Sequence, residues 1–329
     1  MTAKLSRRSI IGGAFAAPFA VRARLATSRG VAPLFGLPIG LPGRLPGDGF
    51  VVRHGYACEN TWYNPGFLHT GEDWYVAEGD SGGALIYAIA DGEVVFAGSE
   101  YPGLVVIVRH AGDLYSMYGH LEYALAVEAG EPVKRGQTLG TVLPRFDGRA
   151  PSHLHFEVRT FLTTAEVNGD APRYPFACGP NCAPGPGYWP IDAPDHPSDQ
   201  GWRNPAHVIG HRGFEGGAVP ADAAVVVASS PPAPSATLWS RPTGATGAKA
   251  RGEVALRPGD RFALLDVRAG REDTRDTSAD AYGLWYRVRL PDERTGWLQA
   301  LLPSTAETGS DGRPSTVQLA LLPDAAALG

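Results

Sequence analysis

The chain has 329 residues and a formal net charge of −5, with 43% hydrophobic and 19% charged residues. That share of apolar residues excludes a globally disordered chain, and the length favours two domains over one. The 42 glycines and 29 prolines follow no collagen-like period and disfavour long helices, so they predict a turn-rich, mainly β protein.

The first 26 residues have the features of a twin-arginine-type signal peptide. Arg7 and Arg8 precede an apolar run over 10–21 that is too short to span a bilayer comfortably. A short N-terminal membrane anchor is the alternative. Without the five basic residues of 1–26 the chain has a charge of −10, which excludes nucleic acid as a favourable partner. We expect an exported protein of the periplasm, cell wall or extracellular space, with no transmembrane anchor after signal removal.

Short apolar runs separated by turns then predict strands. Residues 84–90 and 93–97 flank an Asp-Gly turn and predict one hairpin, and 104–109 with 114–120 predict a second. A further strand is predicted at 153–159. None of these stretches has sustained helical periodicity.

Glycine and proline concentrate outside these strands. Residues 27–49 predict an extended lead-in rather than a packed element, and 171–205 predict an irregular loop that is either functional or poorly ordered. Strand-like alternation returns over 254–302. The final residues, 304–329, predict a loose tail in which 317–322 could still pack.

The strand at 153–159 brings two histidines together. Residues two apart on a strand share a face, so His153 and His155 project into one site while Leu154 and Phe156 face the core. Glu157 shares the histidine face and is a candidate to orient a ligand from behind.

A second pair lies earlier in the chain. His69 and Asp73 are four residues apart around Gly71, which favours a bend that brings both side chains to one place. Two imidazoles with one carboxylate are a frequent Zn²⁺ set that leaves a fourth position open for water. With His120 at the end of a predicted strand, five residues are available, and the two that do not bind metal could transfer protons or stabilise an oxyanion.

The remaining histidines show no such grouping, and we interpret them as ordinary surface or loop residues: His54, His110, His196, His207 and His211. Glycines 210 and 213 argue against a helix that would present His207 and His211 together.

The three cysteines suit an oxidising compartment. Cys178 and Cys182 could form a small loop disulfide, and Cys58 could instead pair with either of them.

These motifs resemble the lysostaphin/LytM-type zinc endopeptidases of family M23: His69-Thr-Gly-Glu-Asp73, Tyr118-Gly-His120-Leu121 and His153-Leu-His155-Phe-Glu157. The resemblance implies an antiparallel β-sheet groove with zinc at its floor. By position it implies that His69, Asp73 and His155 bind zinc and that His120 and His153 are the catalytic pair. Tyr63 lies where a tyrosine lines the groove in some similar enzymes and is a candidate for oxyanion stabilisation or for packing.

The resemblance also sets the expected domain boundaries. The peptidase domain is expected over 50–210, with a Pro/Gly-rich insertion at about 163–200. A linker at 211–222 would precede a unit at 223–303 that resembles a bacterial SH3-like β-barrel.

The expected function is hydrolysis of peptide bonds in peptidoglycan by a secreted, monomeric zinc endopeptidase. Three alternatives stay open: an endopeptidase on Gly-rich extracellular proteins, a non-catalytic wall-binding or amidase-regulating protein, and a zinc D-Ala-D-Ala carboxypeptidase. The five filled positions favour an enzyme, and the His-x-His strand fits the carboxypeptidase less well.

Overall fold

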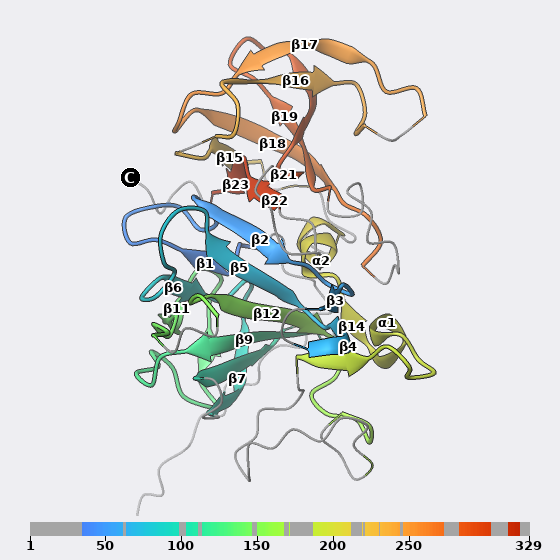
Figure 1. The fold of residues 1–329 in the computed structure, drawn as a ribbon. Helices are drawn as coiled ribbons and strands as arrows, with labels where there is room; N and C mark the ends of the chain where they lie inside the picture. Colours follow the sequence, from blue (N-terminus) through green and yellow to red (C-terminus); the bar gives the residue numbers. More distant parts are fainter. Residues whose placement is uncertain are drawn as a thin grey trace, which may run out of the picture.

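A computed structural model of the chain (Figure 1) describes residues 35–61, 64–98, 103–110, 114–146, 150–167, 171, 187–211, 219, 221–229, 231–243, 246–272, 283–303 and 315–322. The expected signal peptide, Tyr63, Cys178 and Cys182 lie outside these residues, as does most of the predicted tail.

The described residues are mainly β, as predicted, with antiparallel pairing throughout. The strands are β1 (Ile39–Gly40), β2 (Phe50–His54), β3 (Glu59–Asn60), β4 (Asn64–His69), β5 (Glu72–Val76), β6 (Leu85–Tyr87), β7 (Gly92–Gly98), β8 (Leu104–Arg109), β9 (Tyr115–Leu121), β10 (Pro132–Val133), β11 (Thr138–Thr141), β12 (Leu154–Arg159), β13 (Tyr188–Pro190), β14 (Trp202–Arg203), β15 (Ala224–Val227), β16 (Ser235–Trp239), β17 (Ala250–Ala255), β18 (Arg261–Arg268), β19 (Trp285–Arg289), β20 (Thr295–Gln299), β21 (Leu301–Pro303), β22 (Ser315–Val317) and β23 (Leu319–Leu321). Two short helices are α1 (Pro197–Gln200) and α2 (Pro205–His211).

A ten-stranded sheet forms the centre of the molecule, in the order β10-β7-β8-β9-β12-β5-β2-β22-β21, with β14 also paired to β12. The predicted hairpin of 104–109 with 114–120 is confirmed as β8 and β9. The other predicted hairpin is wrong, because β6 pairs with β1 and β11 in a separate three-stranded sheet while β7 pairs with β8. The Asp-Gly turn therefore connects two sheets.

The prediction that the lead-in is not packed is wrong for its described part. Phe35, Leu37 and Ile39 are buried, and β1 forms a ladder with β6. Apolar residues at every second position, spaced by Gly and Pro, fill the core between the sheets although the segment is mostly irregular. Short strand pairing and side-chain burial thus anchor a segment whose composition resembles a linker.

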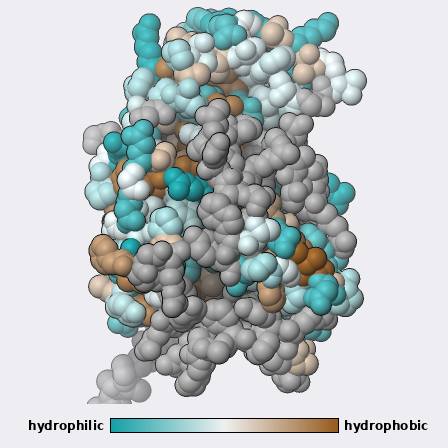
Figure 2. All heavy atoms as spheres, in the orientation of Figure 1, coloured by the Kyte–Doolittle hydropathy of each residue, from teal (hydrophilic) through white to brown (hydrophobic). Residues whose placement is uncertain are grey.

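The C-terminal unit is a seven-stranded sheet, in the order β17-β16-β20-β19-β18-β15-β23. It lies above the central sheet in Figure 1, and the outer surface of this end is largely hydrophilic in Figure 2. Within the predicted tail, the described residues 315–322 pack, as the sequence allowed for 317–322. β22 pairs with β2 of the central sheet, and β23 pairs with β15 of the C-terminal sheet. One segment therefore joins the edges of both sheets.

The argument against a helix near His207 and His211 is also wrong, because α2 spans both. Pro205 is its first residue. The N–H at this position has no acceptor within a helix, so proline, which lacks it, is well tolerated there. The Glu72 carboxylate accepts a hydrogen bond from Ala206 N at 3.2 Å. Gly210 lacks the Cβ that would come within 2.3 Å of Ala269 in the C-terminal unit. The glycine thus allows close packing of the helix on that unit.

Three histidines predicted to be ordinary surface or loop residues are buried instead. His110 bonds Ser116 Oγ at 2.7 Å, and His207 contacts the carbonyl of Arg271. His54 lies beside the residues of the predicted site. Within the described residues, no helix is long and apolar enough to cross a membrane.

Candidate metal centre

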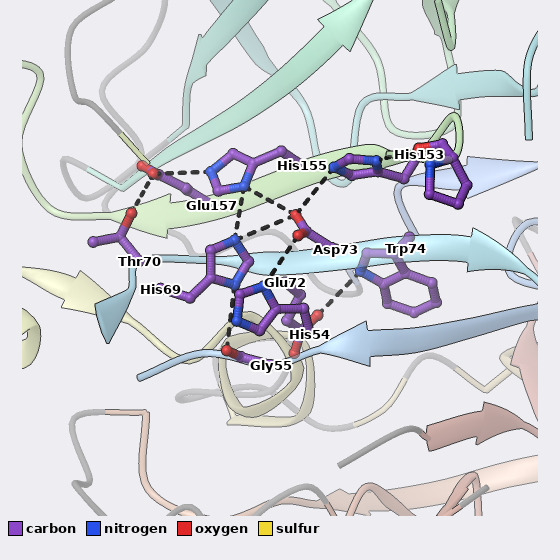
Figure 3. A network of polar contacts seen from close by, with 11 residues as sticks. His54, Gly55, His69, Thr70, Glu72, Asp73, Trp74, His153, His155 and Glu157 are labelled. Carbon is purple, nitrogen blue, oxygen red and sulfur yellow. Dashed lines mark hydrogen bonds and ion pairs between the residues drawn. The ribbon is translucent and has the colours of Figure 1, made fainter. Parts of the chain in front are cut away.

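The centre of the site is one row of residues across four neighbouring strands. In register, Gly119 of β9 lies opposite His155 of β12, and His155 lies opposite Asp73 of β5. Asp73 in turn lies opposite His54 of β2. Directly opposed residues in an antiparallel sheet point to the same face, so the row gathers two imidazoles and a carboxylate at one place (Figure 3). A Cβ at Gly119 would be in ordinary van der Waals contact with the His155 side chain, at 3.4 Å.

His69 completes the predicted set of ligands from the end of β4. Its Nε2 is 2.9 Å from His155 Nδ1 and 3.3 Å from Asp73 Oδ1, and His155 Nδ1 is 3.1 Å from the same oxygen. All three side chains are buried. The structure therefore brings the three predicted zinc ligands together at their donor atoms.

The partners of the outer ring nitrogens indicate which atoms have free lone pairs. His69 Nδ1 lies 3.3 Å from the Gly55 carbonyl, and a carbonyl can only accept, so this nitrogen carries the proton. By the same argument His155 Nε2 donates to Glu157 Oε1 at 3.1 Å. In the neutral rings, the two nitrogens that face Asp73 are both acceptors. Three acceptor atoms at this separation favour a cation between them.

The separation also fits zinc. Tetrahedral Zn²⁺ with bonds of about 2.0–2.2 Å places neighbouring ligand atoms roughly 3.3–3.6 Å apart. The three distances of 2.9, 3.1 and 3.3 Å are slightly shorter and would need only small outward shifts. The residues present therefore fit the metal that the resemblance implies.

Burial and charge oppose each other in this cluster. Burial lowers the pKa of His69 to about 4, against the attraction of Asp73. Burial would raise the pKa of Asp73, but His69, His153 and hydrogen bonds from His155 and His54 hold it well below its usual value. Burial would lower the pKa of His155, but hydrogen bonds to Asp73 and Glu157 raise it to about 9. The two neighbouring carboxylates therefore favour the protonated form of His155.

The predicted catalytic pair lies beside the three predicted ligands. The rings of His120 and His153 are 4.6 Å apart between centroids and nearly perpendicular, and His120 is 6.1 Å from the His155 ring. His153 Nδ1 is 2.8 Å from the Pro151 carbonyl, which leaves Nε2 on the side of Asp73, 3.8 Å from Oδ1. Tyr75 stacks on the His153 ring at 4.7 Å.

His120 has a left-handed backbone, with a φ of 66°. This conformation is uncommon for a residue other than glycine, and such residues concentrate at functional sites. The His120 carbonyl accepts from Leu143 N at 2.8 Å, which ties it to the loop before β12.

Glu157 is fully buried behind His155, on the predicted face of β12. Its Oε1 also accepts from Thr70 Oγ1 at 2.6 Å, and its Oε2 accepts from Trp202 Nε1 at 2.9 Å. Arg159 forms an ion pair with Oε2 at 3.4 Å. Burial would raise the pKa of Glu157, but the hydrogen bond from His155 and the charge of Arg159 lower it to about 2. The carboxylate is thus charged and held in place by four neighbours.

Comparison with known proteins places this constellation in a family. A sequence model described as peptidase family M23 matches residues 67–170. Lipoprotein NlpD of Yersinia enterocolitica is 38% identical over 81 residues, which are 24% of this chain and 80% of that relative. The chain belongs to peptidase family M23.

Other relatives match smaller shares of their own length. Murein hydrolase activator NlpD of Salmonella dublin is 36% identical over 118 residues, 35% of this chain and 28% of that protein. The chain therefore spans less than a third of the length of that curated relative. Cell division protein DipM of Caulobacter vibrioides is 38% identical over 79 residues, 23% of this chain and 13% of that protein.

Two solved structures illustrate the likeness. A catalytic-domain mutant of the prophage-encoded M23 protein EnpA from Enterococcus faecalis is 27% identical, with a TM-score of 0.27, over 39% of this chain and 86% of that one. Lysostaphin is 16% identical, with a TM-score of 0.32, over 82% and 94% of the two chains. The M23 family match ends at residue 170, so the SH3-like assignment of 223–303 stays a prediction.

His54 contacts two of the predicted ligands, and sequence reasoning missed it. Its Nδ1 is 3.3 Å from Asp73 Oδ2, and its ring stacks on His69 with centroids 4.2 Å apart and planes 1° apart. His54, His69 and Asp73 also offer ligand atoms that all lie within 4.8 Å of one another. No spacing in the sequence connects residue 54 with 69 or 73, because the pairing of β2 with β5 makes the contact.

Part of the predicted insertion borders the M23 site. β13 pairs with β4 so that Tyr188 lies opposite His69, and their rings are 5.4 Å apart. Thr70 N donates to the Gly187 carbonyl at 3.0 Å, and a Cβ on Gly187 would come within 3.4 Å of the His155 ring. Residues 187–190 therefore form one wall beside the predicted ligands.

Proposed function

We propose that this M23 chain is a zinc metalloendopeptidase that hydrolyses peptide bonds of peptidoglycan. The observation that supports it most strongly is the convergence of His69, Asp73 and His155 at distances of 2.9–3.3 Å beside two further imidazoles. A site built only to bind metal would need no second pair of histidines.

His69 Nε2, Asp73 Oδ1 and His155 Nδ1 would hold the zinc. When bound, zinc supplies Lewis acidity, which activates water near neutral pH and polarises a peptide carbonyl. Glu157 and the Gly55 carbonyl keep the two imidazoles in the tautomers that present lone pairs to the metal.

His153 and His120 supply the proton transfers. The Pro151 carbonyl holds the Nδ1 proton of His153, so its Nε2 is available on the side of the ligands to accept or return a proton. The His120 ring is perpendicular to it and lies next to the same space, where it can donate to an oxyanion or a leaving amine. Tyr63 would assist the oxyanion if it lines the groove, as the resemblance implies.

The names of the relatives favour peptidoglycan as substrate. One of the proteins compared is called a murein hydrolase activator, a second a lipoprotein and a third a cell division protein. With the signal peptide expected at 1–26, they support a location outside the cytoplasm. We propose that the C-terminal unit is a wall-directed, SH3-like module, and that the mature protein is a monomer.

A second function, activation of another murein hydrolase, is favoured by those same names. An activator would need a surface of the M23 domain that binds the other hydrolase, but it would not need the two histidines proposed to transfer protons. His120→Ala therefore separates the two functions, since it removes one of those imidazoles and none of the proposed ligands.

The test incubates purified mature chain, loaded with zinc, with cell-wall sacculi. Released fragments are analysed by mass spectrometry, with His120→Ala as the matched control. New amino termini within peptides, produced by the wild type alone, support the endopeptidase. If fragments are released only when a purified amidase is added, and the wild type and His120→Ala release equal amounts, the result would support the activator and overturn the endopeptidase.

A further inference from the structure

His54 reaches the site through an irregularity in β2. The ladder between β2 and β5 pairs Val52 with Trp74 and then shifts register, so that His54 rather than Arg53 lies opposite Asp73. In regular pairing Arg53 would occupy that position; in the structure its guanidinium lies 5.1 Å from the centroid of the Tyr75 ring. β-Bulges commonly re-aim one side chain next to an active site.

The two oxygens of Asp73 have different partners. Oδ1 faces the donor atoms of His69 and His155, whereas Oδ2 lies 3.3 Å from His54 Nδ1. Since an ionised carboxylate only accepts hydrogen bonds, Nδ1 of His54 carries the proton in this contact. Figure 3 shows the His54 ring below Asp73, on the side away from His155.

The same segment also holds His69. The rings of His54 and His69 are parallel, and the carbonyl of the next residue, Gly55, accepts from His69 Nδ1. The end of β2 thus contacts two of the three proposed ligands, each through one hydrogen bond.

We propose that His54 is a positioning residue of the metal centre. By donating to Oδ2 it fixes the rotation of the Asp73 carboxylate so that Oδ1 points at the two ligand nitrogens, and its ring fixes the plane of His69. This inference rests on the proposed zinc site. His54 is not a fourth ligand in this arrangement, because its Nδ1 lies at the opposite oxygen of Asp73.

The remaining nitrogen of His54 agrees with this role. Nε2 is buried and has no hydrogen-bond partner in the part of the chain that the structure describes. The ring is therefore held by stacking and by the single bond to Asp73. A buried imidazole retained with one nitrogen unsatisfied costs free energy, so packing alone gives no reason for a histidine here.

Two substitutions separate the hydrogen bond from the packing. His54→Phe keeps a ring that can stack on His69 but cannot donate, whereas His54→Asn keeps a donor near the place of Nδ1 and loses the ring. Full-length protein is freed of metal, refolding is checked by circular dichroism, and zinc affinity is measured by competition with a chromogenic chelator. Metal per chain is counted by mass spectrometry.

We expect His54→Phe to weaken zinc binding by about 10–100-fold, the usual effect of losing a partner behind a metal ligand. His54→Asn should recover most of that loss, and wild type and both variants should hold one zinc per chain. If His54→Phe does not fold, the comparison uses His54→Leu, which also lacks the donor.

Three results would overturn the inference. Equal zinc affinity in the wild type and in the variant without the donor would show that the hydrogen bond does not position Asp73. A fall from two zinc ions per chain to one would make His54 a ligand of a second cation instead. A wild type that binds no zinc would overturn the proposed function as well, whereas the first two outcomes leave it standing.

Discussion

His155 and Asp73 lie directly opposite each other on β12 and β5, with Nδ1 3.1 Å from Oδ1, although 82 residues separate them in the chain. The register of two antiparallel strands, rather than a flexible loop, sets the distance between these proposed ligands. A site on such a framework needs little rearrangement to accept a metal ion.

The first prediction separates metal binding from proton transfer. His155→Ala removes a proposed ligand, so zinc should be lost together with activity. His120→Ala should keep one zinc per chain while turnover falls about 10²–10⁴-fold, the usual contribution of a general acid or base. Zinc content and the rate of fragment release from sacculi are measured on the same preparations. Loss of zinc from His120→Ala would show that the roles are wrongly assigned.

The second prediction concerns Glu157. The Glu157 carboxylate accepts from His155 and Thr70 on one oxygen and from Trp202 on the other. The amide of Glu157→Gln has only one acceptor oxygen, so in either orientation at least one buried donor loses its acceptor. We expect zinc affinity to fall about 10–100-fold, measured by chelator competition. The control is Glu253→Gln. In the wild type, Glu253 accepts a hydrogen bond from Thr237 Oγ1 at 2.8 Å in the C-terminal sheet. Equal zinc affinity in both variants would contradict a positioning role.

The third prediction tests the bend between His69 and Asp73. A Cβ at Gly71 would lie 2.3 Å from the backbone oxygen of Phe156, which cannot move without disturbing β12. Gly71→Ala should lower the free energy of unfolding by about 3 kcal/mol, at the upper end of ordinary overpacking, and weaken zinc binding. Gly98→Ala, whose nearest neighbour would be the Phe96 ring at 3.7 Å, should be tolerated. Urea titration of both variants makes the comparison, and equal midpoints would argue against the clash.

The fourth prediction concerns pH and the buried His110. Burial lowers its folded-state pKa to about 4, against 6.5 for an exposed imidazole. Between these two values the unfolded chain binds the extra proton, so stability falls as the pH falls from about 7 towards 4. Wild type should lose roughly 2 kcal/mol more than His110→Gln between pH 7 and pH 4.5. Denaturant titrations at both pH values measure this difference. Parallel losses would mean that His110 does not titrate as described.

Local patterns in the sequence determined much of this protein. Alternation along 153–159 placed His153, His155 and Glu157 on one face and Leu154 and Phe156 in the core, because a strand has a period of two whatever its neighbours. The motif spacings also grouped the five candidate site residues, whereas their division into three zinc ligands and a histidine pair came from the resemblance to family M23.

Contacts between distant segments were decided by tertiary structure alone. Only the shifted register of β2 on β5 brings His54 to Asp73, and only burial makes a packed element of the lead-in. The last strands join two sheet edges that lie far from them in sequence. Pairing between strands depends on which edges and apolar faces are available after the whole chain has collapsed, and neither composition nor short-range spacing records that.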